Sequence, residues 1–132
     1  MEPDTLDTAP GQSPSSIDHD KIISDHPLLY KYCKGLEIGQ GWYELVYELS
    51  SKIEAILDDQ AQAGYDHCYA AQVKEKYGTL RFYMASETDE ISKLIEEYEN
   101  ESMYICETCG KPGKWYDNGW CHTHCEEHRK WK

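Results

Sequence analysis

The clearest pattern in the sequence is a helical repeat of apolar residues that begins after Gly41. Three glycines within residues 35–41 predict a loop before it. The apolar positions lie three or four residues apart: Trp42, Leu45, Val46, Leu49, Ile53, Ile56 and Leu57. Acids such as Glu44 and Glu54 fall on the opposite side. The pattern predicts an amphipathic helix of about four turns that ends before Gly64, where glycine can adopt the left-handed conformation that closes a helix.

Residues 69–84 follow a period of two, which is typical of strands. The first half alternates Val73, Glu75 and Tyr77 with Gln72, Lys74 and Lys76, and the second half alternates Leu80, Phe82 and Met84 with Thr79, Arg81 and Tyr83. Lys76-Tyr77-Gly78 predicts the turn of a tight β-hairpin. The alternative is one long strand in which Gly78 marks a bulge.

A second helical stripe follows these strands. Its apolar residues are Ile91, Leu94, Ile95 and Tyr98. Ser86 is the expected N-cap, and the acids from Glu96 to Glu101 are expected to face solvent. Residues 26–104 therefore predict an α+β core in the order helix, β-hairpin, helix, with both helices on one face of a small sheet.

The charges and the N-terminal segment change this picture. Residues 1–25 are rich in Pro, Ser, Thr and Asp and have no apolar periodicity before Ile22, so we expect a disordered acidic tail. The net charge is −12. Residues 1–104 carry 21 acids and 8 bases, whereas residues 105–132 carry 4 acids and 5 bases. Most of the chain should therefore repel a phosphate backbone, and only the C-terminal segment is neutral to slightly basic.

Soft metal ligands are concentrated in that C-terminal segment. Cys106-Glu-Thr-Cys109 and Cys125-Glu-Glu-His128 are two ligand pairs with the spacing of a tetrahedral zinc site. Gly110 lets the chain turn behind the first pair. Residues 105–132 therefore predict a zinc-binding module that holds one Zn²⁺ through four ligands: Cys106, Cys109, Cys125 and His128.

The segment between the two ligand pairs predicts a strand, a turn and a strand, because Asn118-Gly119 is a strong hairpin signal. Thr123 or His124 can then cap a helix that carries Cys125 and His128 one turn apart. A Cys-Cys knuckle, a hairpin and ligands at a helix start together predict a treble-clef-like module.

Three nearby residues compete as ligands: Cys121, His122 and His124. Cys121 with Cys125 would complete a four-cysteine site that leaves His128 out. We favour Cys125 and His128, because ligands three residues apart on a helix need no distortion. Four ligands leave no open coordination position, so the metal is expected to be structural and the chain is not expected to be an enzyme. A treble-clef nuclease that uses His122, His124 and Asn118 is the alternative.

Three stretches also occur together in a known family. They are Cys33-x-Gly35…Gly41-Trp42, Val73-Lys-Glu-Lys-Tyr-Gly-Thr-Leu-Arg-Phe-Tyr83 and Cys106-x-x-Cys109-Gly-x-Pro-Gly113…Gly119-Trp120…Thr123-x-Cys125-x-x-His128. With them the chain resembles a family of small uncharacterised phage and prophage proteins over residues 28–128. In the family pattern the last two metal ligands match Cys125 and His128, whereas Cys121 departs from the commoner residue. The resemblance implies a phage context.

Cysteine usage and hydropathy bear on the compartment. The N-terminus lacks the apolar segment of a secretory signal, and no run of about 18 apolar residues predicts a membrane span. Cys33 and Cys68 are isolated and are expected to be half-buried thiols. We therefore expect a cytoplasmic protein, in the host cytoplasm if a phage encodes it.

The expected function is binding of a host or phage protein, with modulation of a host process or a defence system as its purpose. The alternative is nucleic-acid binding through residues 105–132, which the charge makes unfavourable. The chain has eleven Tyr and four Trp but one Phe, so some polar aromatic side chains should be exposed for contact with a partner. The first candidates are Tyr83, Tyr98, Trp115 and Trp120.

Overall fold

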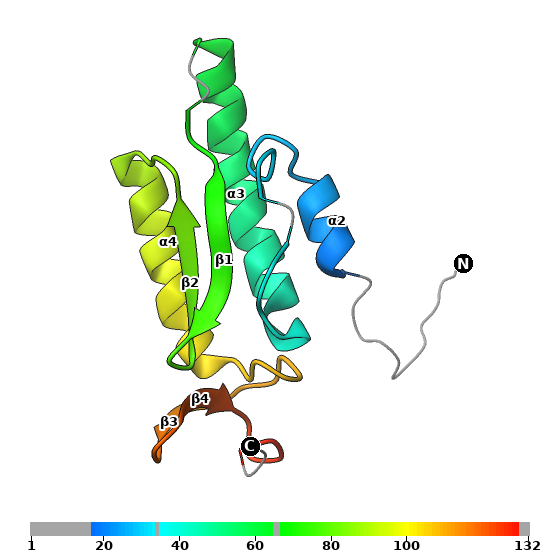
Figure 1. Cartoon of the computed structure of the whole chain (residues 1–132), viewed down its shortest axis with the longest axis vertical. Helices are drawn as coiled ribbons and strands as arrows, with labels where there is room; N and C mark the ends of the chain where they lie inside the picture. Colours follow the sequence, from blue (N-terminus) through cyan, green and yellow to red (C-terminus); the bar gives the residue numbers. More distant parts are fainter. Residues whose placement is uncertain (1–16, 34, 65–66, 130–132) are drawn as a thin grey trace, which may run out of the picture.

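The computed structural model describes residues 17–33, 35–64 and 67–129, and it is an α+β fold (Figure 1). The elements of the core are α2 (His19–Ser24), the short 3₁₀ helix η1 (Gln40–Trp42), α3 (Tyr43–Gln62), β1 (Ala70–Lys76), β2 (Thr79–Met84), α4 (Asp89–Glu101) and the 3₁₀ helix η2 (Ser102–Tyr104). A second hairpin of β3 (Lys114–Asp117) and β4 (Cys121–His124) follows. Both sheets have two antiparallel strands.

The helix predicted after Gly41 is confirmed as α3, which extends to Gln62 and is followed by Gly64 with φ +96°. Its buried stripe packs on the sheet and on α4: Leu45, Val46, Leu49, Ile53 and Leu57. Trp42 lies in η1 rather than in the helix and is completely buried. Glu54 does not face open solvent as predicted, because its two carboxylate oxygens accept the Leu28 and Leu29 backbone N–H groups. This carboxylate fixes the loop that follows α2 against α3.

The predicted hairpin is also confirmed, and the long-strand alternative is wrong. Lys76 pairs with Thr79, and the two turn residues Tyr77 and Gly78 both have positive φ, at 56° and 81°. That is the backbone of a two-residue turn whose twist matches the strands. Val73, Leu80 and Phe82 point from the hairpin into the core: they are buried with the α3 and α4 stripes.

The N-cap of helix α4 lies two residues later than predicted. Thr88, not Ser86, is the N-cap, and its hydroxyl accepts the Ile91 N–H. Glu99 was expected to face solvent, but its carboxylate accepts the Phe82 N–H at the free edge of β2, at 2.9 Å. Burial raises the pKa of Glu99, although the Phe82 N–H and the Arg81 charge partly oppose the shift.

The prediction of a disordered tail over residues 1–25 is wrong for the part that the structure describes. Asp18 caps α2 by accepting the Lys21 N–H at 2.8 Å, and Ile22 is completely buried in the core. His19 Nε2 accepts the Leu36 N–H at 2.8 Å. A six-residue helix with one fully buried residue has too short an apolar pattern to detect by periodicity. Residues 1–16 lie outside the described residues.

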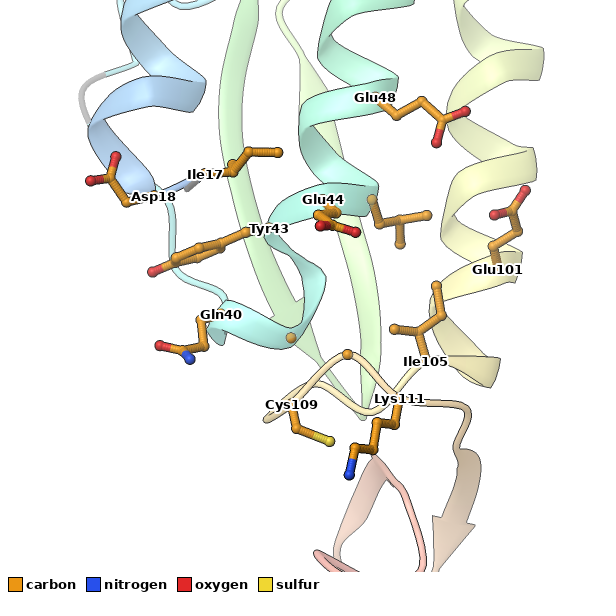
Figure 2. A pocket seen from close by; sticks show the side chains of 13 residues that line it. Ile17, Asp18, Gln40, Tyr43, Glu44, Glu48, Glu101, Ile105, Cys109 and Lys111 are labelled. Atoms are coloured by element: carbon orange, nitrogen blue, oxygen red, sulfur yellow. The ribbon is translucent and has the colours of Figure 1, made fainter. Parts of the chain in front are cut away.

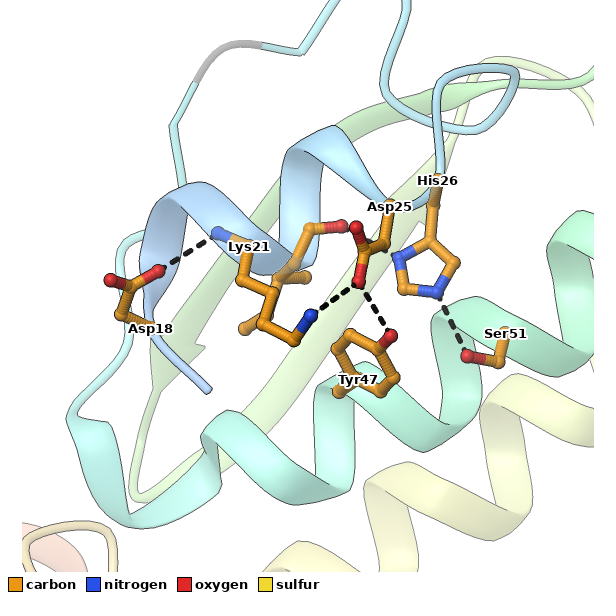
Figure 3. A network of polar contacts seen from close by, with 7 residues as sticks. Asp18, Lys21, Asp25, His26, Tyr47 and Ser51 are labelled. Carbon is orange, nitrogen blue, oxygen red and sulfur yellow. Dashed lines mark hydrogen bonds and ion pairs between the residues drawn. The ribbon is translucent and has the colours of Figure 1, made fainter. Parts of the chain in front are cut away.

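Figure 3 shows the polar contacts that hold α2 against α3. The Asp25 carboxylate accepts the Tyr47 hydroxyl at 2.7 Å and the Lys21 ammonium at 3.0 Å. The hydrogen bonds from Tyr47 and Lys21 lower the pKa of Asp25. His26, which is buried, contacts the Ile22 carbonyl oxygen and the Ser51 hydroxyl through its two ring nitrogens. Within the described residues, no helix combines the length and apolarity needed to cross a bilayer.

Docking of α2 gives a first prediction. Ile22→Ala should lower the free energy of unfolding by about 2–5 kcal/mol, because it leaves a cavity under a completely buried side chain. Urea unfolding measures this change. Ser24→Ala, at an exposed position of the same helix, should change it by less than about 0.5 kcal/mol. Equal, small effects of both substitutions would show that α2 does not pack on the core.

Candidate metal centre

The C-terminal segment that carries β3 and β4 lies next to the turn of the β1–β2 hairpin (Figure 1), and four of the side chains after η2 converge. They are Cys106, Cys109, Cys125 and His128, and their ligand atoms all lie within 4.8 Å of one another. Two come from the loop after η2 and two from the turn after β4. The structure thus brings together all four predicted ligands from segments separated by a hairpin.

The spacing of these atoms suits one tetrahedral cation. Metal–sulfur bonds of about 2.3 Å at tetrahedral angles place two sulfur atoms about 3.8 Å apart. The Cys109 and Cys125 sulfurs are 3.7 Å apart. His128 Nδ1 lies 3.6 Å from the Cys106 sulfur and 3.2 Å from the Cys125 sulfur. The cluster can therefore hold a metal ion with little rearrangement.

Local backbone contacts position the four ligands. The Cys106 N–H donates to the Lys111 carbonyl oxygen, and the Gly110 N–H donates to that of Cys106. Gly110 has φ +85°, so the chain reverses there as the sequence predicts. The His128 N–H donates to the Cys125 carbonyl oxygen, which sets these ligands one turn apart. Residues 126–129 form a turn and not the expected helix, so the treble-clef detail stays a prediction.

The thiols of the cluster differ in acidity. Burial opposes ionisation of Cys125, but hydrogen bonds from the backbone and ring of His128 lower its pKa to about 6. Burial raises the pKa of Cys109 to about 11. Cys125 is thus the more acidic of the two thiols, and a bound cation has to displace the proton of Cys109. Metal binding at this site should therefore strengthen as the pH rises.

The competing ligands do not join the cluster. Cys121 lies outside the group of four, so the four-cysteine alternative lacks support in the described residues. His122 and His124 are buried and face each other, with their Nδ1 atoms 2.7 Å apart. His124 Nε2 lies 3.0 Å from the hydroxyl of Thr108, inside the Cys106–Cys109 loop. His124 thus contacts the Cys106–Cys109 loop from the β3–β4 hairpin, and His122 packs behind His124.

Aromatic rings complete this support. His122 is stacked on Tyr116, at 5.2 Å between ring centroids, and on Trp120, at 4.6 Å. A completely buried, stacked histidine is poorly placed to hold a catalytic ion in contact with substrate. The arrangement therefore gives no support to the nuclease alternative, for which His122 and His124 were the candidates.

The module meets the core through very close backbone contacts at one end. The Trp42 indole N–H donates to the Ile105 carbonyl oxygen at 2.8 Å, and the Gly41 N–H donates to that of Glu107 at 3.0 Å. A Cβ on Gly39 or Gly41 would overlap the backbone of residues 106–107. From the sequence, these glycines were expected only to form a loop. The absent side chains in fact allow the two backbones to touch.

The β1–β2 turn makes the second contact between core and module. The Thr123 hydroxyl donates to the Gly78 carbonyl oxygen at 2.6 Å, and the Trp115 indole N–H donates to that of Tyr77 at 2.8 Å. A Cβ on Gly78 would overlap the backbone of His122. Two features therefore require glycine at position 78. Its turn has a positive φ, and β4 approaches too closely for a side chain.

A groove of about 740 Å³ runs between the core and the first ligand pair (Figure 2). Its lining includes the carboxylates of Asp18, Glu44, Glu48 and Glu101 and, on the side of the metal cluster, Cys109 and Lys111. Figure 2 shows these side chains contributed by the start of α2, by α3, by α4 and by the loop after η2. The sequence could not reveal this groove, because its walls come from four separate segments.

The expected exposure of aromatic residues is partly correct. Tyr83, Trp115 and Trp120 are exposed, at 40%, 38% and 41%. Tyr98 is the exception: at 3% exposure it belongs to the core stripe of α4. Among the described residues, Tyr32, Tyr77 and Tyr104 are also exposed and were not predicted to be. Cys33 and Cys68 are free thiols and are buried rather than half-buried as predicted.

Comparison with known protein families, curated proteins and solved structures gave no match.

The ligand assignment can be tested by metal analysis. Cys109→Ser should reduce the content from about one ion per chain to near zero, because a hydroxyl is a poor replacement for a thiolate. Cys121→Ser is the matched control, since Cys121 lies in the same segment but outside the cluster. Elemental analysis of both purified variants decides the point. Loss of metal in Cys121→Ser with retention in Cys109→Ser would refute the ligand set.

The glycine contact gives another prediction. Gly41→Ala should lower the free energy of unfolding by about 1–3 kcal/mol or more, because the methyl group overlaps the Cys106 carbonyl oxygen. Gly35→Ala meets no atom within 4 Å and should leave it unchanged or raise it by up to about 1 kcal/mol. Chemical denaturation compares the two variants. A tolerated Gly41→Ala would mean that the loop and the module are not in contact.

Proposed function

We propose that this chain binds a host or phage protein and that a structural zinc ion stabilises its C-terminal module. Three thiolates and an imidazole form a soft donor set that suits Zn²⁺ in tetrahedral coordination. The four ligands leave no position open for a substrate, which supports a structural role for the ion. Binding of zinc then contributes to folding of residues 105–129, by about 10–16 kcal/mol at neutral pH in comparable small sites.

The observation that carries the proposal is a pair of exposed aromatic rings where the core meets the module. Trp115 bonds through its indole N–H to the Tyr77 carbonyl oxygen, and the two side chains are 38% and 65% exposed. This bond and the β1–β2 turn hold both residues in place. Rigid, exposed aromatic side chains dominate the energetics of protein interfaces, since they bury a large area with little loss of conformational entropy.

The sequence indicates in which cell and compartment the partner is expected. The resemblance to phage and prophage proteins favours a partner in the infected host, such as a component of a host process or of a defence system. None of the six cysteines is in a disulfide, which agrees with a reducing compartment such as the host cytoplasm. A net charge of −12 argues against nucleic acid as the main partner.

The test compares capture of a partner by matched variants. Wild-type protein is used as bait in extracts of the host, and binding of the captured protein is then measured with the two purified components. Trp115→Ser and Tyr77→Ser should each weaken binding by at least about tenfold, as expected for aromatic residues central to an interface. Zinc content, measured on each variant, shows whether the module is still intact.

Tyr32→Ser is the control, because Tyr32 is as exposed as Tyr77 but packs on Tyr69 in another part of the core. Binding that depends on Tyr32 and not on Trp115 would contradict the proposed surface. Retention of DNA or RNA at physiological salt, lost on Lys114→Gln, would support the nucleic-acid alternative instead.

A further inference from the structure

The outer face of the β1–β2 hairpin carries an unusual concentration of positive charge. The cross-strand pairs on this face are Gln72–Tyr83, Lys74–Arg81 and Lys76–Thr79. Lys76 and Tyr83 are exposed, and Lys74 and Arg81 are half-buried. In Figure 1, α3 and α4 lie behind the hairpin and no labelled element covers its near side. We call Lys74, Lys76, Arg81 and Tyr83 the cationic face.

This charge is out of keeping with the rest of the chain. The sequence from residue 53 to residue 92 has no Lys or Arg other than these three, and all three fall on one face of the hairpin. Glu37, whose backbone pairs with Lys74, brings one carboxylate to the edge of the face. None of the three cations is within 4 Å of a carboxylate among the described ion pairs. The carboxylate of Glu99, whose pKa is raised by burial and partly lowered by the Arg81 charge, is a second acid beside these cations, so the face keeps an excess of one positive charge in a protein of charge −12.

The Lys74–Arg81 pair also opposes folding. Like charges directly opposite each other in an antiparallel pair repel and destabilise the sheet. Arg81 is held in place, because its Nε–H donates to the Thr79 hydroxyl on the same face at 3.0 Å. An anionic group lying between the two side chains would convert this repulsion into attraction. The arrangement thus suits a ligand that supplies negative charge.

Both edges of the hairpin already have hydrogen-bond partners. On β2, the Leu80 and Phe82 N–H groups donate to Ser102 and Glu99 side chains. On β1, Glu37 exchanges backbone hydrogen bonds with Val73 and Glu75. A partner strand cannot add at these positions without breaking those bonds. A ligand therefore has to use the face and its side chains.

We propose that the cationic face binds an acidic segment of the partner protein that also presents apolar side chains. This inference rests on the proposed function and names the chemistry of its partner. Carboxylates of the segment pair with Lys74 and Arg81, and its apolar side chains contact the Tyr83 ring. The face also continues toward the aromatic pair of the proposed interface, since the Lys76 ammonium lies 5.6 Å from the centre of the Tyr77 ring.

Charge favours a short acidic segment over a nucleic acid. A polyanion extends beyond the cationic face and meets the repulsion of the other acids of this chain. A peptide with two or three carboxylates interacts mainly with the nearby cations, because charges farther away than about 10 Å are screened at moderate salt. Nucleic acid is therefore an outcome that the test has to distinguish.

The experiment uses zinc-loaded full-length protein labelled with ¹⁵N and three designed twelve-residue peptides. The peptides share the same leucines and the same uncharged residues and differ at three positions only, which are Glu, Gln or Lys. Addition of the Glu peptide should shift the backbone amide signals of residues 72–76 and 79–83, with a Kd that weakens as salt is raised. The Gln and Lys peptides should leave these signals unchanged. A twelve-nucleotide single-stranded DNA is titrated in parallel.

The decisive variant is Lys74→Gln combined with Arg81→Gln. It should weaken binding of the Glu peptide by at least about tenfold. Its melting temperature should be unchanged or higher than that of the wild type, because the like-charge pair has been removed. Lys93→Gln, at an exposed position of α4, is the control for charge and should bind normally.

Several results would overturn the inference. These are equal binding of the Glu and Gln peptides, absence of binding by the Glu peptide, normal binding by the double variant, or tighter binding of the DNA to the same amides. Binding of the Lys peptide alone would show that the partner is basic. None of these results bears on whether capture of a partner depends on Trp115. The peptide titration can therefore refute the acidic partner segment while the proposed function still stands, and the capture experiment can refute the proposed function independently.

Discussion

The contact between the buried Trp42 and the loop after η2 is the constraint on which the architecture depends. The indole ring is completely buried at the start of α3, and its N–H is bonded to the Ile105 carbonyl oxygen. Gly41 lies beside it, bonded to Glu107 and too close to Cys106 for any side chain. Trp42 thus belongs to the hydrophobic core and also fixes the chain that leads into the first ligand pair. The positions of the first ligand pair and of the groove follow from this contact.

The metal has a clear physical role in this arrangement. The hydrophobic cluster of the described residues reaches Ile105 and includes nothing beyond it. After that point the buried side chains are ligands or polar groups: Cys106, His122, Thr123, His124 and Cys125. Such a segment buries too little apolar surface to offset the entropy lost on folding. A cation bound by the four ligands supplies the missing stabilisation, and the backbone contacts at Gly41 and Gly78 connect it to the core.

Sequence reasoning was most successful where a local pattern determines the structure. Apolar periodicity identified α3 and α4, turn chemistry identified both hairpins, and ligand spacing identified the four residues that cluster. It failed where the decisive contact is long-range. Glu54 and Glu99 looked like solvated acids because their backbone partners are 17 or more residues away. The cationic face required the strand register, and α2 required knowledge that Ile22 meets the core.

Hydrogen–deuterium exchange before and after removal of zinc by a chelator tests the central claim most directly. If the ion folds the module and the Trp42 contact joins the module to an independent core, chelation should remove protection from residues 105–129 and from Gly41 and Trp42. The amides in the middle of α3 and those in β1 should keep theirs, because the hydrophobic core remains packed. Unchanged protection in residues 105–129, or simultaneous loss throughout the chain, would contradict this account.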